Sequence, residues 1–258
     1  HWMDKIMLGI ILQSTAIVAF YVYAENIISL PKGILTALDT VMLPRISHML
    51  ANNRIEESIQ KFRDNLKFNN FLCCALCFGI AGMVPNFIPW FLGAEYLPSI
   101  PLAIELAAVM IPMGIANVVQ TQYLIPFRLE HIYVRAVILG AIINTILNLV
   151  LIPLWNASGA VIATLIAETI VCVYQLFYIR NIYHIRYLMK SLLPFVICGA
   201  MEFAATYLIG KLPLQTWAVL LVQICFGGAV YLAASSIYLI FISKEYHSFR
   251  DMIKVLKI

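Results

Sequence analysis

Apolar residues run along this chain in long blocks that short polar connections separate. A helix needs about 20 apolar residues to cross the hydrocarbon core of a bilayer, where lipid offers no hydrogen-bond partners for open backbone groups. The blocks therefore predict membrane-spanning helices. A partial span covers residues 3–12, and the full spans are predicted at 16–49, 68–92, 101–125, 134–153, 158–179, 188–209 and 217–242.

The first full span is unusually long, and a polar stretch follows it. At 1.5 Å per residue, a helix over 16–49 is about 50 Å long, which exceeds the bilayer core. Pro31 and Pro44 are predicted to bend or end it. In the polar stretch 51–67, apolar residues recur every three or four positions among charges. This pattern predicts a separate interfacial or surface helix.

Composition narrows the class of protein. The 258 residues are 62% apolar and 12% charged, whereas soluble domains carry about 25% charged residues. A soluble enzyme, a disordered chain and a disulfide-stapled secreted domain are therefore excluded, which leaves an all-α polytopic membrane protein. The six cysteines lie in apolar runs and are interpreted as small apolar side chains. No catalytic motif is present, so we expect no enzyme, cofactor, metal site or nucleic-acid partner.

Basic residues lie almost entirely on one side of the predicted spans. The connections and tail on that side hold fourteen, and the opposite side holds Lys211 alone. Basic loops stay in the cytoplasm, so we expect this side and the C-terminus to be cytoplasmic. The fourteen are Arg45, Arg54, Lys61, Arg63, Lys67, Arg128, Arg135, Arg180, Arg186, Lys190, Lys244, Arg250, Lys254 and Lys257.

Charged and amide side chains also occur inside the spans. Glu25, Lys32 and Asp39 are seven residues apart, so they form one stripe on the long helix. Two interpretations stay open for this stripe: the wall of a hydrated cavity, or ion pairs that fix helix packing. Further groups with helical spacing are Asn117, Gln120 and Thr121, then Asn144 and Asn148, then Glu168 and Gln175, for which interhelical hydrogen bonding is the favoured interpretation.

Several segments resemble the Wzx-type flippases of the multidrug/oligosaccharidyl-lipid/polysaccharide exporter superfamily. They are DKIMLG at 4–9, FYVYAENII at 20–28, VMLPRIS at 41–47, TQYLIP at 121–126, VILGA at 137–141 and the run 144–168. The resemblance implies a MATE-like two-lobed transporter. Residues 1–180 would be its C-terminal lobe with a truncated first helix, and residues 181–258 two additional helices with a cytoplasmic tail. The chain would then be part of a longer protein that also has an N-terminal lobe.

The resemblance also implies a function. Family members move undecaprenyl-pyrophosphate-linked oligosaccharide repeat units across the bacterial cytoplasmic membrane for surface polysaccharide synthesis, by alternating access. The implied partners are the lipid-linked oligosaccharide, membrane lipids, the N-terminal lobe, and polysaccharide polymerase or export machinery. A multidrug/cation antiporter of the same superfamily is the alternative, and a membrane-integrated transferase is less favoured because the loops are short.

The implied translocation path contains charges of both signs. Family cavities tend to be cationic, but here three acids accompany Lys5, Lys32 and Arg45. Glu25, Asp39 and Glu168 are the candidates for coupling to a proton or sodium gradient. The path residues are Asp4, Lys5, Glu25, Lys32, Asp39, Arg45, Asn117, Gln120, Asn144 and Asn148.

Overall fold

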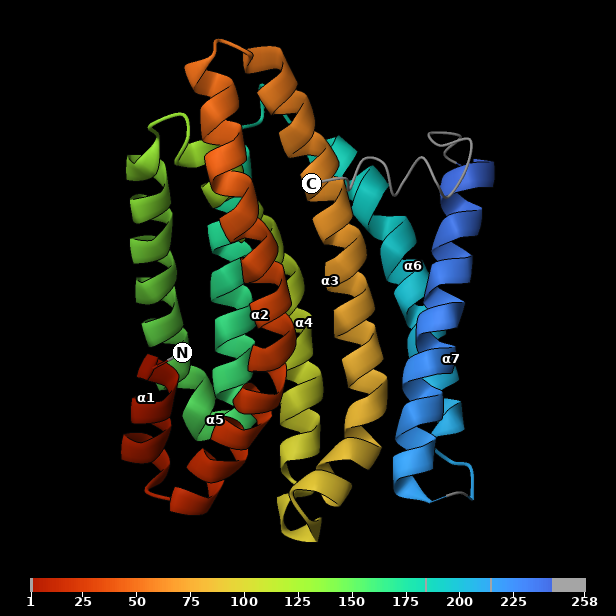
Figure 1. The fold of residues 1–258 in the computed structure, drawn as a ribbon. Helices are drawn as coiled ribbons and strands as arrows, with labels where there is room; N and C mark the ends of the chain where they lie inside the picture. Colours follow the sequence, from red (N-terminus) through yellow and green to blue (C-terminus); the bar gives the residue numbers. More distant parts are fainter. Residues whose placement is uncertain (1, 184, 214, 243–258) are drawn as a thin grey trace.

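The computed structural model describes residues 2–183, 185–213 and 215–242, all of which lie in helices or their short connections. Figure 1 shows the long helices side by side, with α1 and the first part of α5 at one edge and α7 at the other. The elements are α1 (Trp2–Leu12), α2 (Thr15–Ala51), α3 (Ile55–Phe91), η1 (Ala94–Tyr96), α4 (Ser99–Val119), η2 (Gln120–Leu124), α5 (Glu130–Tyr178), α6 (Ile185–Ile209), α7 (Thr216–Ile237) and η3 (Tyr238–Ile242).

Helix α5 is a hairpin of two antiparallel helices. Its backbone leaves helical geometry at Trp155 and Asn156, where the φ of Asn156 is 52°. Figure 1 shows the chain descending in green and returning in teal. Next to the turn, a Cβ on Gly159 would collide with the carbonyl oxygen of Leu151, so the close approach of the two arms requires glycine there.

The structure confirms an all-α polytopic membrane protein. Six described helices are long and apolar enough to cross a membrane. Because α5 turns back on itself, these six helices provide seven crossings, which match the predicted full spans. The polar break after α1 is also confirmed, since Gln13 has a φ of 49° and the Ser14 hydroxyl accepts a hydrogen bond from the Ile17 amide at 3.5 Å.

The prediction of a separate helix at 51–67 is wrong. Most of that stretch forms the first turns of α3, which runs without interruption from Ile55 to Phe91. Phe62 and Leu66 are fully buried, and the Phe62 ring lies 5.6 Å from that of Tyr123. The apolar stripe therefore packs into the protein, and the packing extends the helix beyond the apolar span.

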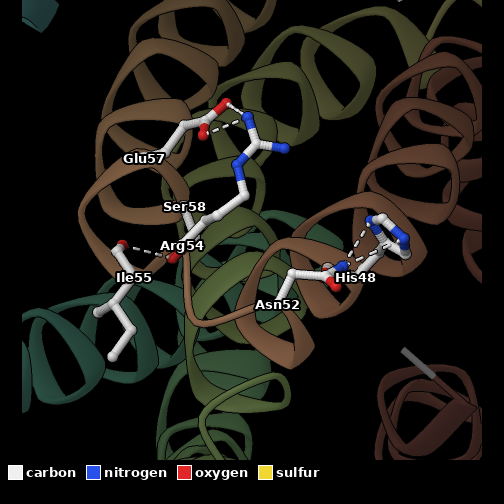
Figure 2. A network of polar contacts seen from close by, with 6 residues as sticks. All are labelled: His48, Asn52, Arg54, Ile55, Glu57 and Ser58. Atoms are coloured by element: carbon white, nitrogen blue, oxygen red, sulfur yellow. Dashed lines mark hydrogen bonds and ion pairs between the residues drawn. The ribbon is translucent and has the colours of Figure 1, made fainter.

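Neither proline of α2 ends that helix, which continues to Ala51 along the curved course seen in Figure 1. The turn into α3 depends on local polar contacts, drawn in Figure 2. The Asn52 side chain donates to the His48 carbonyl at 2.8 Å, and Asn53 adopts a φ of 57°. Arg54 then donates to Glu57 at 2.6 Å across the first turn of α3.

Helices α6 and α7 pack against α3 through small residues. A Cβ added to Gly82 or Gly227 would collide with the Thr206 side chain, so glycine lets these helices approach closely. Gln223 is buried here and donates to the Thr206 carbonyl at 2.8 Å. The sequence indicated two additional helices at this place but not the glycine contacts that attach them.

Candidate functional site

Two pockets among the described residues are lined by acids of the helix interiors, one by Asp4 and Glu168 and the other by Asp39. The first, which we call the Asp4 pocket, has a volume of about 240 Å³ and lies between α1 and the two arms of α5. Its lining residues are Met3, Asp4, Val137, Gly140, Ala141, Asn144, Thr164, Ala167, Glu168 and Val171.

Asp4 is the best-coordinated carboxylate at this site. It is 1% exposed and accepts hydrogen bonds from three helical segments. Asn148 donates to its Oδ1 at 2.7 Å, while Thr164 and Tyr21 donate to its Oδ2 at 3.1 and 3.3 Å. Asn148 and Thr164 each lie eight residues from Asn156, so the α5 hairpin brings them opposite one another. These charge-assisted hydrogen bonds fix the carboxylate in place.

The asparagines of α5 complete this network. Asn144 donates to Thr164 at 3.2 Å and accepts from Asn148 at 3.1 Å. The expectation that Asn144 and Asn148 share a face is therefore confirmed. The Oδ1 atom of Asn148 is buried without a hydrogen-bond partner among the described residues. Carboxylate, hydroxyl and amide oxygens thus gather at one place, and they are the ligand types that hard cations prefer.

The two lysines of the helix interiors lie beside the Asp4 pocket. Lys5 and Glu25 form an ion pair of 2.7 Å between α1 and α2, with side chains 25% and 14% exposed. The acids close enough to act electrostatically on Lys32 are Glu25, Glu168 and Asp4. Groups of both signs from α1, α2 and α5 therefore lie near one another, and the cluster can attract an anion through its lysines or a cation through its acids.

Asp39 lies outside this cluster, although it belongs to the same sequence stripe as Glu25 and Lys32. It lies in the Asp39 pocket, a second pocket of about 170 Å³ between α2, α3 and the end of α4. Gln122 donates to Asp39 Oδ1 at 3.2 Å, and Asn65 donates to Gln122 at 2.8 Å. The lining residues are Leu38, Asp39, Val41, Met42, Arg45, Lys61, Asn65, Phe68, Asn69, Val118 and Gln122.

Asn117 and Gln120 line neither pocket. The chain makes a π-helical turn over Gln120–Leu124, in which the Ile125 amide donates to the Gln120 carbonyl at 2.9 Å. One extra residue in that turn rotates the following side chains, and Gln122 points to Asp39. Sequence spacing assumed a regular helix, so it missed Gln122 together with its partner Asn65. Thr164 was missed as well, because only the hairpin places it beside Asp4.

Comparison with known proteins shows what fold these pockets belong to. No family model matches the chain, and no curated protein matches it. Among solved structures, lipid II flippase MurJ in its inward closed conformation is similar, with a TM-score of 0.75 and 23% sequence identity. The match covers 92% of this chain and 48% of MurJ, so the chain spans about half the length of that protein.

The similarity establishes the class of fold. The chain has a MATE-like fold, similar to that of part of the lipid II flippase MurJ. The assignment of the chain to a C-terminal lobe with two additional helices stays a prediction. The boundary between the lobe and the additional helices at residue 180 stays a prediction, and the basic tail after residue 243 lies outside the described residues.

Proposed function

We propose that the whole protein to which this chain belongs is a flippase. It moves an undecaprenyl-pyrophosphate-linked oligosaccharide repeat unit across the cytoplasmic membrane for surface polysaccharide synthesis. The observation that carries the proposal is the charged cluster of Lys5, Glu25 and Lys32 in a chain whose fold is similar to a lipid flippase. Charges within membrane helices are costly and are usually retained for a pathway or a partner.

In this proposal the lysines attract the pyrophosphate of the lipid carrier. Lys5 and Lys32 lie on α1 and α2, and Arg45 lies further along α2 in the Asp39 pocket. These three cations follow one another from the Asp4 pocket towards the end of α2. A second lobe would close the site, and rocking between the lobes would open it to each side in turn. The protein is then a transporter rather than an enzyme.

The coupling acids are proposed from the same clusters. Glu168 lines the Asp4 pocket, Glu25 pairs with Lys5, and Asp39 has one carboxylate oxygen without a partner among the described residues. A proton or sodium ion that binds one of these acids changes the charge opposite a lysine. Binding of the ion and of the anionic carrier would thereby be linked.

Substitution of Lys32 in the whole protein tests the function. The variants are expressed in a strain whose export depends on this protein, and surface polysaccharide is normalised to the amount of the protein in the membrane. Lys32→Gln is expected to lower this ratio by at least about tenfold, whereas Lys32→Arg is expected to retain part of the export. Lys211→Gln, at an exposed cation of the opposite connection, is the control. Normal export by Lys32→Gln at normal protein level contradicts the proposal.

A purely structural role for Lys32 gives a different pattern. Lys32→Gln then removes a positive charge that acts on Glu168 and Glu25, and it lowers the protein level. The double variants Lys32→Gln/Glu25→Gln and Lys32→Gln/Glu168→Gln distinguish the roles. Recovery of both protein level and export by a double variant would leave only the structural role.

The second candidate function is a multidrug/cation antiporter of the same superfamily. The observation in its favour is that Asp4, Glu25 and Glu168 outnumber Lys5 and Lys32 around the Asp4 pocket. An antiporter would expel a small organic cation and would bind it through these acids. Cation uptake into everted vesicles that is lost in Glu168→Gln, with normal polysaccharide export, would establish the antiporter.

Orientation in the bacterial cytoplasmic membrane is part of the proposal. The α2–α3 turn, the α4–α5 connection and the α5–α6 connection carry the basic residues and are proposed to be cytoplasmic, together with the C-terminus. Polysaccharide polymerase or export machinery would be partners on the opposite side. In a cysteine-free background, an impermeant reagent added outside should label Lys211→Cys and not Asn53→Cys, and the reverse result would overturn the orientation.

A further inference from the structure

A third pocket lies where α5 ends and α6 begins. Its volume is about 700 Å³, and its lining residues are Val173, Leu176, Phe177, Arg180, Arg186, Tyr187 and Lys190. Three of these residues are cations and none is an acid, so the pocket has a strongly positive wall. We call it the basic pocket.

Helical spacing places the cationic and the apolar side chains of the basic pocket next to one another. On α5, Val173 and Phe177 are four residues apart and share one face, and Arg180 follows just beyond the end of the helix. On α6, Arg186 and Lys190 are likewise four residues apart. The Arg180 guanidinium lies over the Phe177 ring at 4.3 Å, and the Phe177 and Tyr187 side chains are 58% and 59% exposed. The pocket therefore joins a cationic end to exposed apolar surface.

Contacts with α3 hold the connection between the two helices. Arg63 of α3 donates to the Ile182 carbonyl at 2.7 Å, and the buried Tyr183 ring lies 6.1 Å from that of Phe62. Within the connection, the amides of Ile182 and Tyr183 both donate to the Ile179 carbonyl at 2.9 Å. The spacing between Arg180 and the first turns of α6 is thus set by the fold.

The basic pocket faces away from the candidate translocation site. Glu168 and Val171 line the Asp4 pocket, whereas Val173 and Phe177 line the basic pocket. Successive helix residues are about 100° apart, so Val171 and Val173 point in nearly opposite directions. A molecule in the basic pocket would therefore approach α5 from the side opposite the Asp4 pocket.

We propose that the basic pocket binds the phosphate headgroup of an anionic phospholipid from the surrounding bilayer, with an acyl chain along Val173 and Phe177. Arginine matches phosphate oxygens bidentately, and basic pockets between membrane helices are recurrent headgroup sites. Exposed Phe177 and Tyr187 offer the apolar and aromatic surface that suits the chain and the interface. The site is independent of the proposed transport activity.

The test measures lipid binding to the whole protein in detergent by native mass spectrometry, with phosphatidylglycerol and phosphatidylcholine of the same acyl chains. The pocket variant carries Arg180→Gln, Arg186→Gln and Lys190→Gln. Its Kd for phosphatidylglycerol should rise by at least about tenfold, because each cation contributes to the attraction. The wild type should bind phosphatidylglycerol at least about tenfold more tightly than phosphatidylcholine.

The control variant carries Arg128→Gln, Arg135→Gln and Lys211→Gln, which remove the same charge from exposed positions elsewhere. Its Kd should stay within about twofold of the wild type. Equal weakening in both variants, or equal binding of the two lipids by the wild type, overturns the proposal. If the pocket variant is not monodisperse, Arg186→Gln and Lys190→Gln are measured as single variants. An unchanged Kd for phosphatidylglycerol in both single variants also overturns the proposal.

The source of the phosphate is tested separately. Undecaprenyl pyrophosphate is titrated against bound phosphatidylglycerol in the wild type and in the pocket variant. We expect the phospholipid to remain bound. The opposite result is that undecaprenyl pyrophosphate displaces phosphatidylglycerol from the wild type at a concentration below that of the phospholipid, and that this displacement is lost in the pocket variant. That result would assign the pocket to the transported lipid and overturn its assignment to a phospholipid of the bilayer. Lys32→Gln should leave phosphatidylglycerol binding unchanged, so failure of the flippase proposal and failure of this one are distinguishable.

Discussion

Two buried aspartates of this chain have opposite surroundings. Asp4 receives hydrogen bonds from Tyr21, Asn148 and Thr164, which lie on α2 and on both arms of α5. Asp39 receives one, from Gln122, and its Oδ2 is buried without a partner among the described residues. Both side chains are at most 4% exposed.

The difference separates a carboxylate that joins several helices from one that can still take a further partner. A carboxylate that accepts hydrogen bonds from three helical segments holds those segments together. A buried carboxylate oxygen that no protein group binds is costly, so binding of a proton or a cation there is favoured. We therefore expect Asp4 to matter for stability and Asp39 for function.

Asp4→Asn should give the largest loss of stability. The new amide group brings donors to a place where three donors already converge, which leaves buried polar groups unsatisfied at a cost of about 3 kcal/mol. The midpoint of thermal unfolding of the whole protein should fall by roughly 5 °C or more. Glu95→Gln, at an exposed acid of η1, is the control. Equal midpoints for the two variants would contradict the structural role of Asp4.

Tyr21→Phe should have an intermediate effect. It removes one of the donors to Asp4 and keeps the ring, which is fully buried, so we expect a loss of about 1 kcal/mol. In the Asp4→Asn background the same change should cost less, since the hydrogen bond is already disturbed. Tyr207→Phe, at an exposed tyrosine, is the control for removal of a hydroxyl. Additive losses in the double variant would show that the two side chains do not interact.

Asp39→Asn should have the smallest effect on stability. Asparagine keeps an acceptor for Gln122 and removes a buried charge, so the unfolding midpoint should stay within about 2 °C of the wild type or rise. Export should nevertheless fall if Asp39 binds the coupling ion. A loss of stability as large as that of Asp4→Asn would show that the two aspartates do not differ in the way their contacts indicate.

Most of the fold was predictable from hydropathy. The spans, the break after residue 12 and the two arms of α5 follow from the apolar blocks and from the polar residues between them. The separate helix at 51–67 was predicted wrongly because its charges marked it as surface. Packing of Phe62 and Leu66 instead makes it part of α3.

The candidate site was predictable only in part. Sequence spacing identified Glu25, Lys32 and Asp39 as one stripe, but only Asp39 lines one of the two pockets, and Glu25 and Lys32 lie near Asp4 and Glu168 instead. Each step of seven residues moves the next side chain further along α2, where its neighbours belong to other helices. Asn144 and Asn148 were paired correctly, since they lie on one regular helix. The resemblance placed Asn117 and Gln120 on the translocation path, and this stays a prediction. The π-helical turn puts Gln122, which spacing did not single out, beside Asp39.

By itself, the sequence determined that this protein is a helical membrane protein with charges inside its spans and basic residues on one side. The hydropathy of a segment decides whether it can span the membrane, and the basic residues of the connections decide the orientation. Both properties belong to single segments and do not depend on partner helices, so the sequence alone shows them. Only the tertiary structure decided which charges meet. The donors to Asp4 lie 17, 144 and 160 residues away in sequence, and helix packing together with the turn at Asn156 brings them to one carboxylate.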